Sequence, residues 1–224
     1  MKRIFLMILA IPVLSLFVAS AFSQGTTKTI ALDSLKDQKA VNVKVETGEY
    51  KSRKALRVTD DAPATAGDGD RLLVLTATDF SGGIIELELS GQVMPNAGEG
   101  ARGFVGLAFR VTNDAAKFEC FYLRPTNGRA EDQVRRNHSA QYISHPDFPW
   151  HKLREEFPEK YESYVDLVPG EWTKVKIEVN GTKAKLYVHG SSQPVLIVND
   201  LKLGESKGAI GLWVGPGTVA HFSN

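Results

Sequence analysis

Apolar and polar residues alternate with a period of two along most of the chain, and long helical periodicity is scarce. Such alternation is typical of strands that bury one face. Gly, Asn, Asp and Pro stand between the alternating runs as turn residues. The expected strands are residues 41–46, 55–59, 72–76, 84–89, 104–111, 118–123, 172–179, 183–188, 194–198, 209–214 and 219–222. Many short strands with regular turns predict an all-β sandwich or barrel.

Three stretches interrupt this pattern. Residues 34–40 are compatible with one short helical turn, and residues 60–70 read as a flexible acidic loop. Residues 151–161 are compatible with a short helix that Pro158 ends or kinks. The sequence contains no internal repeat and no second domain.

Residues 117–154 begin as a strand and then become unusually polar. Three of the five histidines and one of the three tryptophans of the chain lie in this segment. Long loops without regular structure are uncommon in compact domains and are often functional. We expect a long polar loop that contacts a ligand; the alternative is an ordered surface loop that closes one end of the fold.

The N-terminus has the features of a signal peptide. Lys2 and Arg3 precede the apolar residues 4–18, and Ala19-Ser20-Ala21 supplies a cleavage site. We therefore expect a signal peptide over residues 1–23, followed by one domain over residues 24–224 of a secreted or periplasmic protein. An uncleaved anchor helix is the alternative; after cleavage we expect no contact with a membrane.

Composition restricts the remaining functions. A mature chain of about 200 residues is long enough for one core without disulfides, and Cys120 is the only cysteine. The formal net charge is +1, and nucleic-acid binding requires a clustered basic face, so we expect no nucleic-acid partner. The sequence carries no signal for an oligomeric state.

The C-terminal third has the most specific turns. Pro169-Gly170-Glu171 is a turn directly before Trp172, the first residue of an expected strand. Asn180-Gly181 is a hairpin signal. A glycine-punctuated apolar strand, GAIGLWVGPGT, covers residues 208–218, and the chain ends in Phe-Ser-Asn.

In this order the segments resemble the concanavalin A-like lectin/glucanase superfamily, in particular its secreted bacterial branch of 3-keto-disaccharide hydrolases and laminin-G-like domains. The likeness covers residues 104–224. It implies a concanavalin A-like jelly-roll sandwich of two curved antiparallel sheets, with a ligand on the concave sheet or its rim loops. A fold does not by itself assign chemistry.

A sugar site needs planar polar groups for hydroxyls and an aromatic face for the ring, placed among apolar walls. Residues that supply both lie in the strands at 104–111 and 118–123 and in the polar segment. The candidate ligand-binding residues are Arg110, Tyr122, Arg124, Asn127, Gln141, Tyr142, His145 and Trp150. The alternative role for the arginines is internal pairing with Glu119, Asp132 or Glu155.

We expect Trp172 and Trp213, which lie in regular strands, to be structural and Trp150 to face the ligand. Small residues beside Arg110, namely Gly106 and Ala108, would let a ligand lie close to the sheet.

The residues leave open whether the protein is an enzyme. The three-acid strand motif of family 16 glucanases is absent; Glu86 and Glu88 share a strand face, as a carboxyl pair or as plain solvated residues. For an oxidised sugar, elimination needs only a base and an electrophile. His138 or His145 is the candidate base, and Arg124 or a metal ion is the candidate electrophile.

We expect no metal and no other cofactor, because the histidines are too widely spaced for a zinc motif. Calcium is the alternative, with oxygen ligands from the acidic loop, namely Asp60, Asp61, Asp68 and Asp70.

The leading hypothesis is a secreted carbohydrate-binding or carbohydrate-processing jelly roll with its ligand under the 124–154 segment. The alternatives are a glycoside hydrolase similar to the 3-keto-disaccharide hydrolases, and a structural or adhesive surface module.

Overall fold

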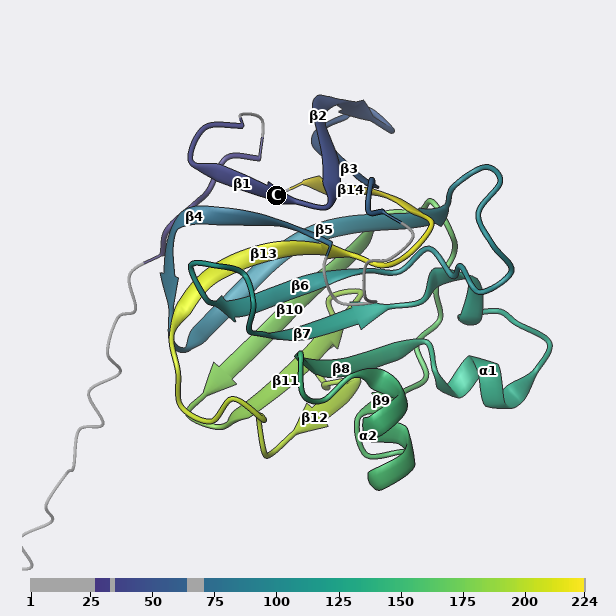
Figure 1. The fold of residues 1–224 in the computed structure, drawn as a ribbon. Helices are drawn as coiled ribbons and strands as arrows, with labels where there is room; N and C mark the ends of the chain where they lie inside the picture. Colours follow the sequence, from purple (N-terminus) through teal and green to yellow (C-terminus); the bar gives the residue numbers. More distant parts are fainter. Residues whose placement is uncertain (1–26, 33–34, 64–70, 224) are drawn as a thin grey trace, which may run out of the picture. The chain divides into compact units, whose positions relative to one another are not determined.

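A computed structural model describes residues 27–32, 35–63 and 71–223 of the chain (Figure 1). Within them, two antiparallel sheets of seven strands each form a sandwich, which confirms the all-β jelly-roll prediction. Residues Ala31–Asn224 form one compact unit. The signal-peptide region lies outside the described residues; within them, no helix has the length and apolarity needed to cross a membrane.

Sheet A carries the features on which the site depends. Its strands, in spatial order, are β1 (Gln38–Val41), β4 (Leu72–Phe80), β13 (Gly208–Val214), β6 (Val105–Val111), β7 (Phe118–Leu123), β8 (Ala140–His145) and β9 (Glu162–Ser163).

Sheet B forms the second layer of the sandwich. Its strands, in spatial order, are β12 (Leu196–Val198), β11 (Lys183–Val188), β10 (Thr173–Asn180), β5 (Gly83–Val93), β14 (Thr218–Ser223), β3 (Arg53–Asp60) and β2 (Val43–Tyr50).

The core lies between the two sheets and follows directly from the alternation. In sheet A, Leu107 is in register with Phe121 on one side and Leu212 on the other. In sheet B, Leu89 is in register with Phe222. All five side chains are at most 2 % exposed. Because neighbouring residues of a strand point to opposite faces, the residues between them face away from the core.

The outer face of sheet B is an ordinary solvated surface. Glu86 is in register with Lys176, and Glu88 with Lys174. Glu88 also forms an ion pair with Arg53. Glu86 and Glu88 therefore lie on the sheet opposite to the candidate site described below, as plain solvated residues.

The polar segment differs from the expected long loop. After β7 it contains the 3₁₀ helix η1 (Pro125–Asn127), the helices α1 (Gln133–Asn137) and α2 (Trp150–Glu156), and strand β8 between the helices. The alternation of apolar and polar residues did not predict strand β8. Its sequence, AQYISH, carries polar residues on both faces, and both faces are covered.

Two further N-terminal expectations differ from the structure. The described part of residues 34–40 is not helical: β1 begins at Gln38 and pairs with β4. Residues 33 and 34 lie outside the described part. Asp60 belongs to β3, and residues 64–70 of the expected acidic loop, with Asp68 and Asp70, are outside the described residues.

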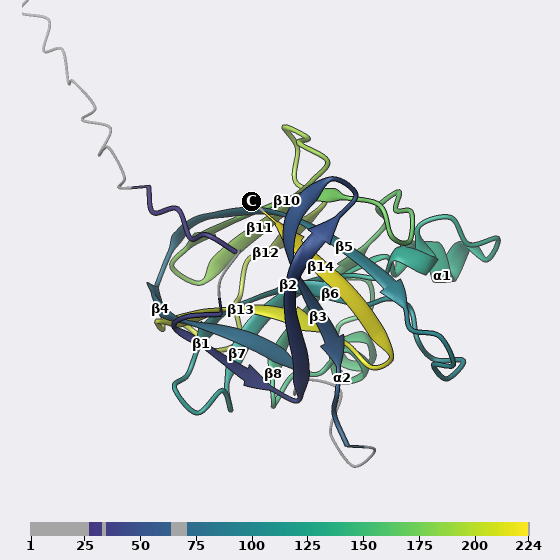
Figure 2. The ribbon, with the colours of Figure 1, turned by 90° about the horizontal axis from the view of Figure 1, so that it is seen from above.

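One end of the sandwich gathers segments that are distant in sequence. Helix α1 and the loop between β5 and β6 both project there (Figure 1 and Figure 2). The backbone N–H of Thr126, in η1, donates to the carbonyl of Arg102 in that loop. The loop and the polar segment are thus held together at the edge of sheet A.

Candidate functional site

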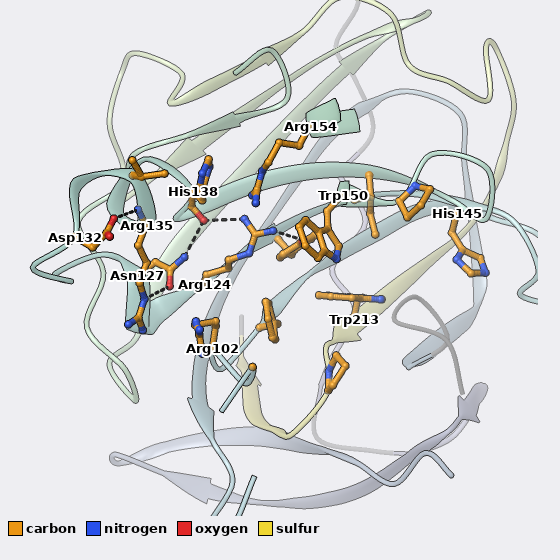
Figure 3. Close-up of a pocket in the computed structure, with 17 residues that line it drawn as sticks. Arg102, Arg124, Asn127, Asp132, Arg135, His138, His145, Trp150, Arg154 and Trp213 are labelled. Carbon is orange, nitrogen blue, oxygen red and sulfur yellow. Dashed lines mark hydrogen bonds between the residues drawn. The ribbon is translucent and has the colours of Figure 1, made fainter. Parts of the chain in front are cut away.

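A pocket of about 680 Å³ lies on the outer face of sheet A, beneath the polar segment (Figure 3). Strands β7, β8 and β13 and the residue before β6 line the pocket on the side of the sheet. Helices α1 and α2 line it on the opposite side. The lining residues are Gly100, Arg102, Phe104, Tyr122, Arg124, Asn127, Asp132, Val134, Arg135, His138, Ile143, His145, Pro149, Trp150, Arg154, Trp213 and Pro216.

The floor of the pocket is aromatic. Tyr122 and Trp213 flank Gly106 on adjacent strands, and their ring centroids are 4.7 Å apart. Phe104 packs edge-on against Tyr122 at 6.0 Å. A β carbon on Gly106 would lie 2.5 Å from Cβ of Tyr122, so this glycine makes room for the tyrosine rather than for a ligand.

Arg124 lies at the centre of the pocket and is only 5 % exposed. Its Nη1 donates to the carbonyl of His138 at 2.8 Å, and its Nη2 donates to the Tyr122 hydroxyl at 2.8 Å and to Oε1 of Gln141 at 3.2 Å. These acceptors are neutral. Desolvation accordingly lowers the pKa of Arg124, but an arginine remains charged at neutral pH.

Helix α1 forms one wall. Its N-cap Asp132 accepts a hydrogen bond from the backbone N–H of Arg135 at 2.7 Å, which satisfies one free donor at the helix start. The Arg135 side chain turns back to η1, where Nε donates to Oδ1 of Asn127 at 2.9 Å and Nη2 donates to Oγ1 of Thr126 at 3.2 Å. Both Asn127 and Arg135 are thereby fixed at the pocket.

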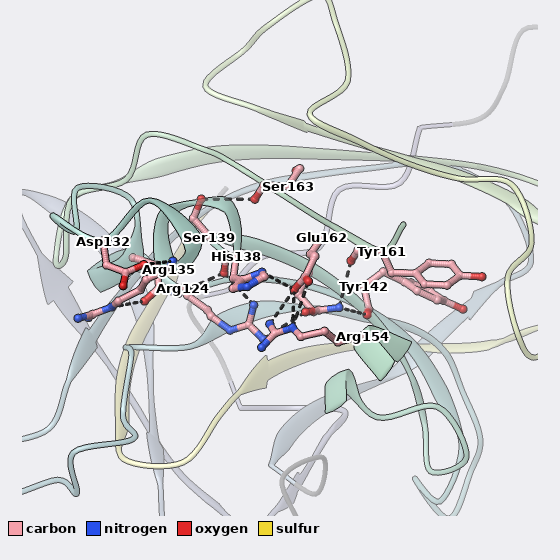
Figure 4. A network of polar contacts seen from close by, with 12 residues as sticks. Arg124, Asp132, Arg135, His138, Ser139, Tyr142, Arg154, Tyr161, Glu162 and Ser163 are labelled. Atoms are coloured by element: carbon pink, nitrogen blue, oxygen red, sulfur yellow. Dashed lines mark hydrogen bonds and ion pairs between the residues drawn. The ribbon is translucent and has the colours of Figure 1, made fainter. Parts of the chain in front are cut away.

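A second wall is a polar cluster around Glu162, on β9 (Figure 4). Nδ1 of His138 lies 2.8 Å from Oε2 of Glu162, and Nη2 of Arg154 donates to the same oxygen at 2.7 Å. Desolvation lowers the pKa of His138 despite this carboxylate. The lowered pKa favours the neutral imidazole near pH 7.

Helix α2 carries Trp150 to the pocket. Leu153 is fully buried and anchors the helix on the sheet. The guanidinium carbon of Arg154 lies 4.9 Å from the Trp150 ring centroid, and that of Arg124 lies 6.0 Å away. His145 also lines the pocket and stacks on Phe118 with centroids 4.8 Å apart.

Most of the predicted ligand-binding residues come together here: Tyr122, Arg124, Asn127, His145 and Trp150, with the candidate base His138. Gln141 does not line the pocket. Its Oε1 accepts a hydrogen bond from Nη2 of Arg124 and so holds that side chain in position. The structure does not bring Tyr142 or Arg110 to it.

Tyr142 points into the core because it follows Gln141 in a strand, and adjacent residues face opposite sides. Its hydroxyl donates to Oε2 of Glu119 at 2.5 Å and accepts from the Lys202 backbone N–H at 2.9 Å. Burial raises the pKa of Glu119. Glu119 is therefore a core residue that holds Tyr142, and it pairs with no arginine of the pocket.

Arg110 leaves the outer face of sheet A because of a backbone irregularity. Its φ is 56°, and the pairing of β6 with β13 shifts register at this point. Its guanidinium donates to the carbonyls of Ser81, Gly181 and Gly204 at 2.6–3.1 Å. It closes three turns at one end of the sandwich instead of facing a ligand.

Trp213 combines two roles that the sequence treated as exclusive. It is 3 % exposed, as expected of a structural residue, and it also forms the pocket floor. Sequence reasoning also missed Arg102 and Phe104, which carry no local signal. Arg135 and Arg154 belonged to the polar segment, and its density of hydrogen-bonding groups was the signal that pointed to them.

Metal binding and cysteine chemistry are the two other possibilities that the described residues bear on. No group of three or more His, Cys, Asp and Glu side chains is arranged there to hold a metal ion. Asp60 instead forms an ion pair with Arg71 at 2.6 Å and accepts from the Gly217 backbone N–H. Cys120 is fully buried, which raises the pKa of its thiol well above the usual value and makes it unreactive.

No family model matches the sequence, and no curated protein matches it. The fold is similar to that of the carbohydrate-binding module CBM66 from Bacillus subtilis, with a TM-score of 0.57 and 16 % identity over 84 % of this chain and 92 % of that one. It is also similar to a protein of unknown function with a galectin-like fold from Bacillus subtilis, with a TM-score of 0.55 and 13 % identity over 86 % and 90 % of the two chains. These likenesses agree with a concanavalin A-like fold.

Proposed function

We propose that this chain is a secreted carbohydrate-binding protein that holds a sugar in the pocket on sheet A. The observation that carries the proposal is the combination of an aromatic floor, Tyr122 and Trp213, with the guanidinium groups and amide of the walls. Sugar rings present both apolar C–H faces and hydroxyl edges, and such a pocket matches both. The likeness to CBM66, a carbohydrate-binding module, supports the same class of ligand.

The pocket favours binding over ordinary glycoside hydrolysis. A retaining glycosidase needs two carboxyl groups about 5 Å apart across the bond to be cleaved. Asp132 is the only carboxylate lining the pocket in the described part of the chain, and its side chain caps α1. Internal pairing of the arginines, which would suit a purely structural module, accounts for Arg154 but not for Arg124 or Arg135.

Export is part of the proposal and rests on the N-terminal sequence. The charged start, apolar run and small residues before Gln24 fit a cleaved signal peptide. N-terminal sequencing of the mature protein should find a start near residue 22 or 24. A mature chain that still begins at Met1 would contradict export by this route.

Trp150→Ala should weaken sugar binding by about tenfold or more, because aromatic side chains at the centre of a contact dominate its free energy. Glycan-array screening followed by calorimetric titration measures the effect. Trp172→Phe is the matched control, since Trp172 packs against Tyr50 outside the pocket. Equal affinities of the Trp150→Ala variant and the wild type would remove Trp150 from the site.

A second candidate function is elimination on an oxidised sugar, as the resemblance to the 3-keto-disaccharide hydrolases implies. The observation that favours it is His138, an imidazole at the pocket wall whose Nδ1 faces Glu162 and whose pKa is lowered by desolvation. This leaves Nε2 to take the proton next to a ketone, while Arg124 stabilises the enolate. The electron pair of the enolate then expels the glycosidic oxygen, which takes up a proton.

This candidate makes a two-part prediction. A 3-keto-glucoside should be cleaved by the wild type and at least about a hundredfold more slowly by His138→Gln, the usual size of a general-base contribution. Laminarin should not be cleaved, because no carboxyl pair is present among the described lining residues. His189→Gln is the control, since His189 is not among the lining residues of the pocket and contacts the Asp166 carbonyl instead. Turnover that survives His138→Gln unchanged would exclude the proposed base.

A further inference from the structure

The pocket carries an excess of positive charge. Four of its lining residues are arginines: Arg102, Arg124, Arg135 and Arg154. Among the described residues, Asp132 supplies the only lining carboxylate, and Glu162 adds one behind the wall. His138 does not add a full charge near pH 7, because desolvation lowers its pKa. The four guanidinium charges therefore exceed the two carboxylate charges by two.

Most arginines outside the pocket form ion pairs with carboxylates. Of the six described arginines outside the pocket, four form an ion pair with a carboxylate, namely Arg53, Arg57, Arg71 and Arg129. The other two, Arg110 and Arg136, bond neutral acceptors. In the part of the chain that the structure describes, Arg102, Arg124 and Arg135 have only neutral acceptors. Three of the five described arginines that bond only neutral acceptors therefore line this one pocket.

The hydrogen bonds of these arginines leave donors available. Nη1 of Arg102 donates to the carbonyls of Glu99 and Ala101, and among the described residues no acceptor is bonded to its Nε or Nη2. Arg135 uses Nε and Nη2 on Asn127 and Thr126, which leaves Nη1. Both side chains are half-buried and line the same pocket. Together they can bind one planar or tetrahedral anion.

Electrostatics favours such an anion. Desolvation, and then the charges of Arg135 and Arg124, lower the pKa of Arg102. The three cations therefore repel one another in a partly desolvated site. A bound carboxylate or sulfate would relieve this repulsion, and charge-assisted hydrogen bonds from arginine to such groups are stronger than neutral ones.

We propose that the pocket binds an anionic saccharide, with its ring on the aromatic floor and its carboxylate or sulfate group on Arg102 and Arg135. The proposal rests on the carbohydrate-binding function proposed above and specifies its ligand class. The aromatic groups Trp150 and Trp213 and the cationic groups Arg102 and Arg135 lie on opposite sides of Arg124 in Figure 3. A uronic acid or a sulfated sugar carries both a ring face and an anion in this arrangement.

The test uses ligand pairs that differ only in charge. The purified protein is titrated with oligogalacturonate and alginate oligosaccharides and with their neutral methyl esters, and with sulfated galactan oligosaccharides and their desulfated forms. At low salt we expect the acidic member of a pair to bind about tenfold or more tightly, the scale of a hydrogen bond to a charged group. This preference should shrink as salt is raised.

The variants assign the preference to residues. Arg102→Gln and Arg135→Gln should each reduce the preference for the acidic member by about tenfold. Arg129→Gln is the matched control, because Arg129 lies in the same segment but is exposed and paired with Asp166. Thermal unfolding of each variant checks that it is folded. The salt dependence of the wild type provides a reading that does not depend on any variant.

Each outcome separates the two proposals. Equal binding of acidic and neutral members, without salt dependence, overturns the anionic ligand but leaves carbohydrate binding intact. A preference unchanged in both glutamine variants overturns the assigned residues. Binding of inorganic sulfate with no binding of any saccharide overturns carbohydrate binding and the anionic saccharide together.

Discussion

Arg110→Met should destabilise the folded protein by at least about 3 kcal/mol, because three part-buried carbonyls lose a charged donor and each hydrogen bond to a charged group is worth about 1.5–3 kcal/mol. Arg110 is 2 % exposed as a residue, and its guanidinium donates to the carbonyls of Ser81, Gly181 and Gly204. These residues belong to three different turns, so no neighbouring side chain can replace the donor set. Urea denaturation of the variant measures the loss.

Two comparisons make this result specific. Arg110→Lys keeps a donor and a charge and should recover part of the stability. Arg57→Ala removes an exposed arginine paired with Glu46, and an exposed ion pair is worth only about 0–1 kcal/mol. The affinity for sugar should be unchanged in Arg110→Met, since Arg110 lies outside the pocket on sheet A. A stable Arg110→Met variant with impaired sugar binding would restore Arg110 to the ligand site.

Trp213→Ala should destabilise the protein by about 3–5 kcal/mol, the usual cost of removing a buried tryptophan. Trp213 is 3 % exposed and packs on Tyr122 between β4 and β6. Sugar binding should fall as well, because the same ring is part of the pocket floor. Denaturation and titration on one preparation separate the two effects.

Trp213→Phe is the control for this prediction, since it keeps an aromatic plate in the same place. It should lose less stability than Trp213→Ala and retain more binding. A loss of less than about 1 kcal/mol in Trp213→Ala would show that the site does not depend on this packing. Trp150→Ala provides the contrast, because Trp150 is half-buried on a helix at the surface and contributes less to the core.

The double role of Trp213 explains why stability and binding are linked on sheet A. Its floor residues alternate with core residues along the same strands. Tyr122 lies between Phe121 and Leu123, which face the other sheet. A substitution on the floor therefore changes the packing of the sheet that positions the walls. The walls, in contrast, come from α1, α2 and the β5–β6 loop and can vary with less effect on the core.

The sequence by itself determined the layered all-β fold and most strand positions. Period-two alternation is a local property, and so are turns such as Asn180-Gly181, which joins β10 to β11 as predicted. Alternation alone left open which face of the 118–123 strand is buried, and the structure places Tyr122 on the outer face of sheet A, where it lines the pocket. The role of the polar segment in the pocket was visible in its composition, although β8 within it was not.

Only the tertiary structure decided which of these residues share the pocket. Arg102 meets Arg135 because the β5–β6 loop and η1 are bonded at one edge of sheet A, which no local pattern records. Arg110 is turned away by a positive φ and a register shift. Strand register and the crossing of distant loops are long-range properties, and a one-residue change in them moves a side chain to the opposite face.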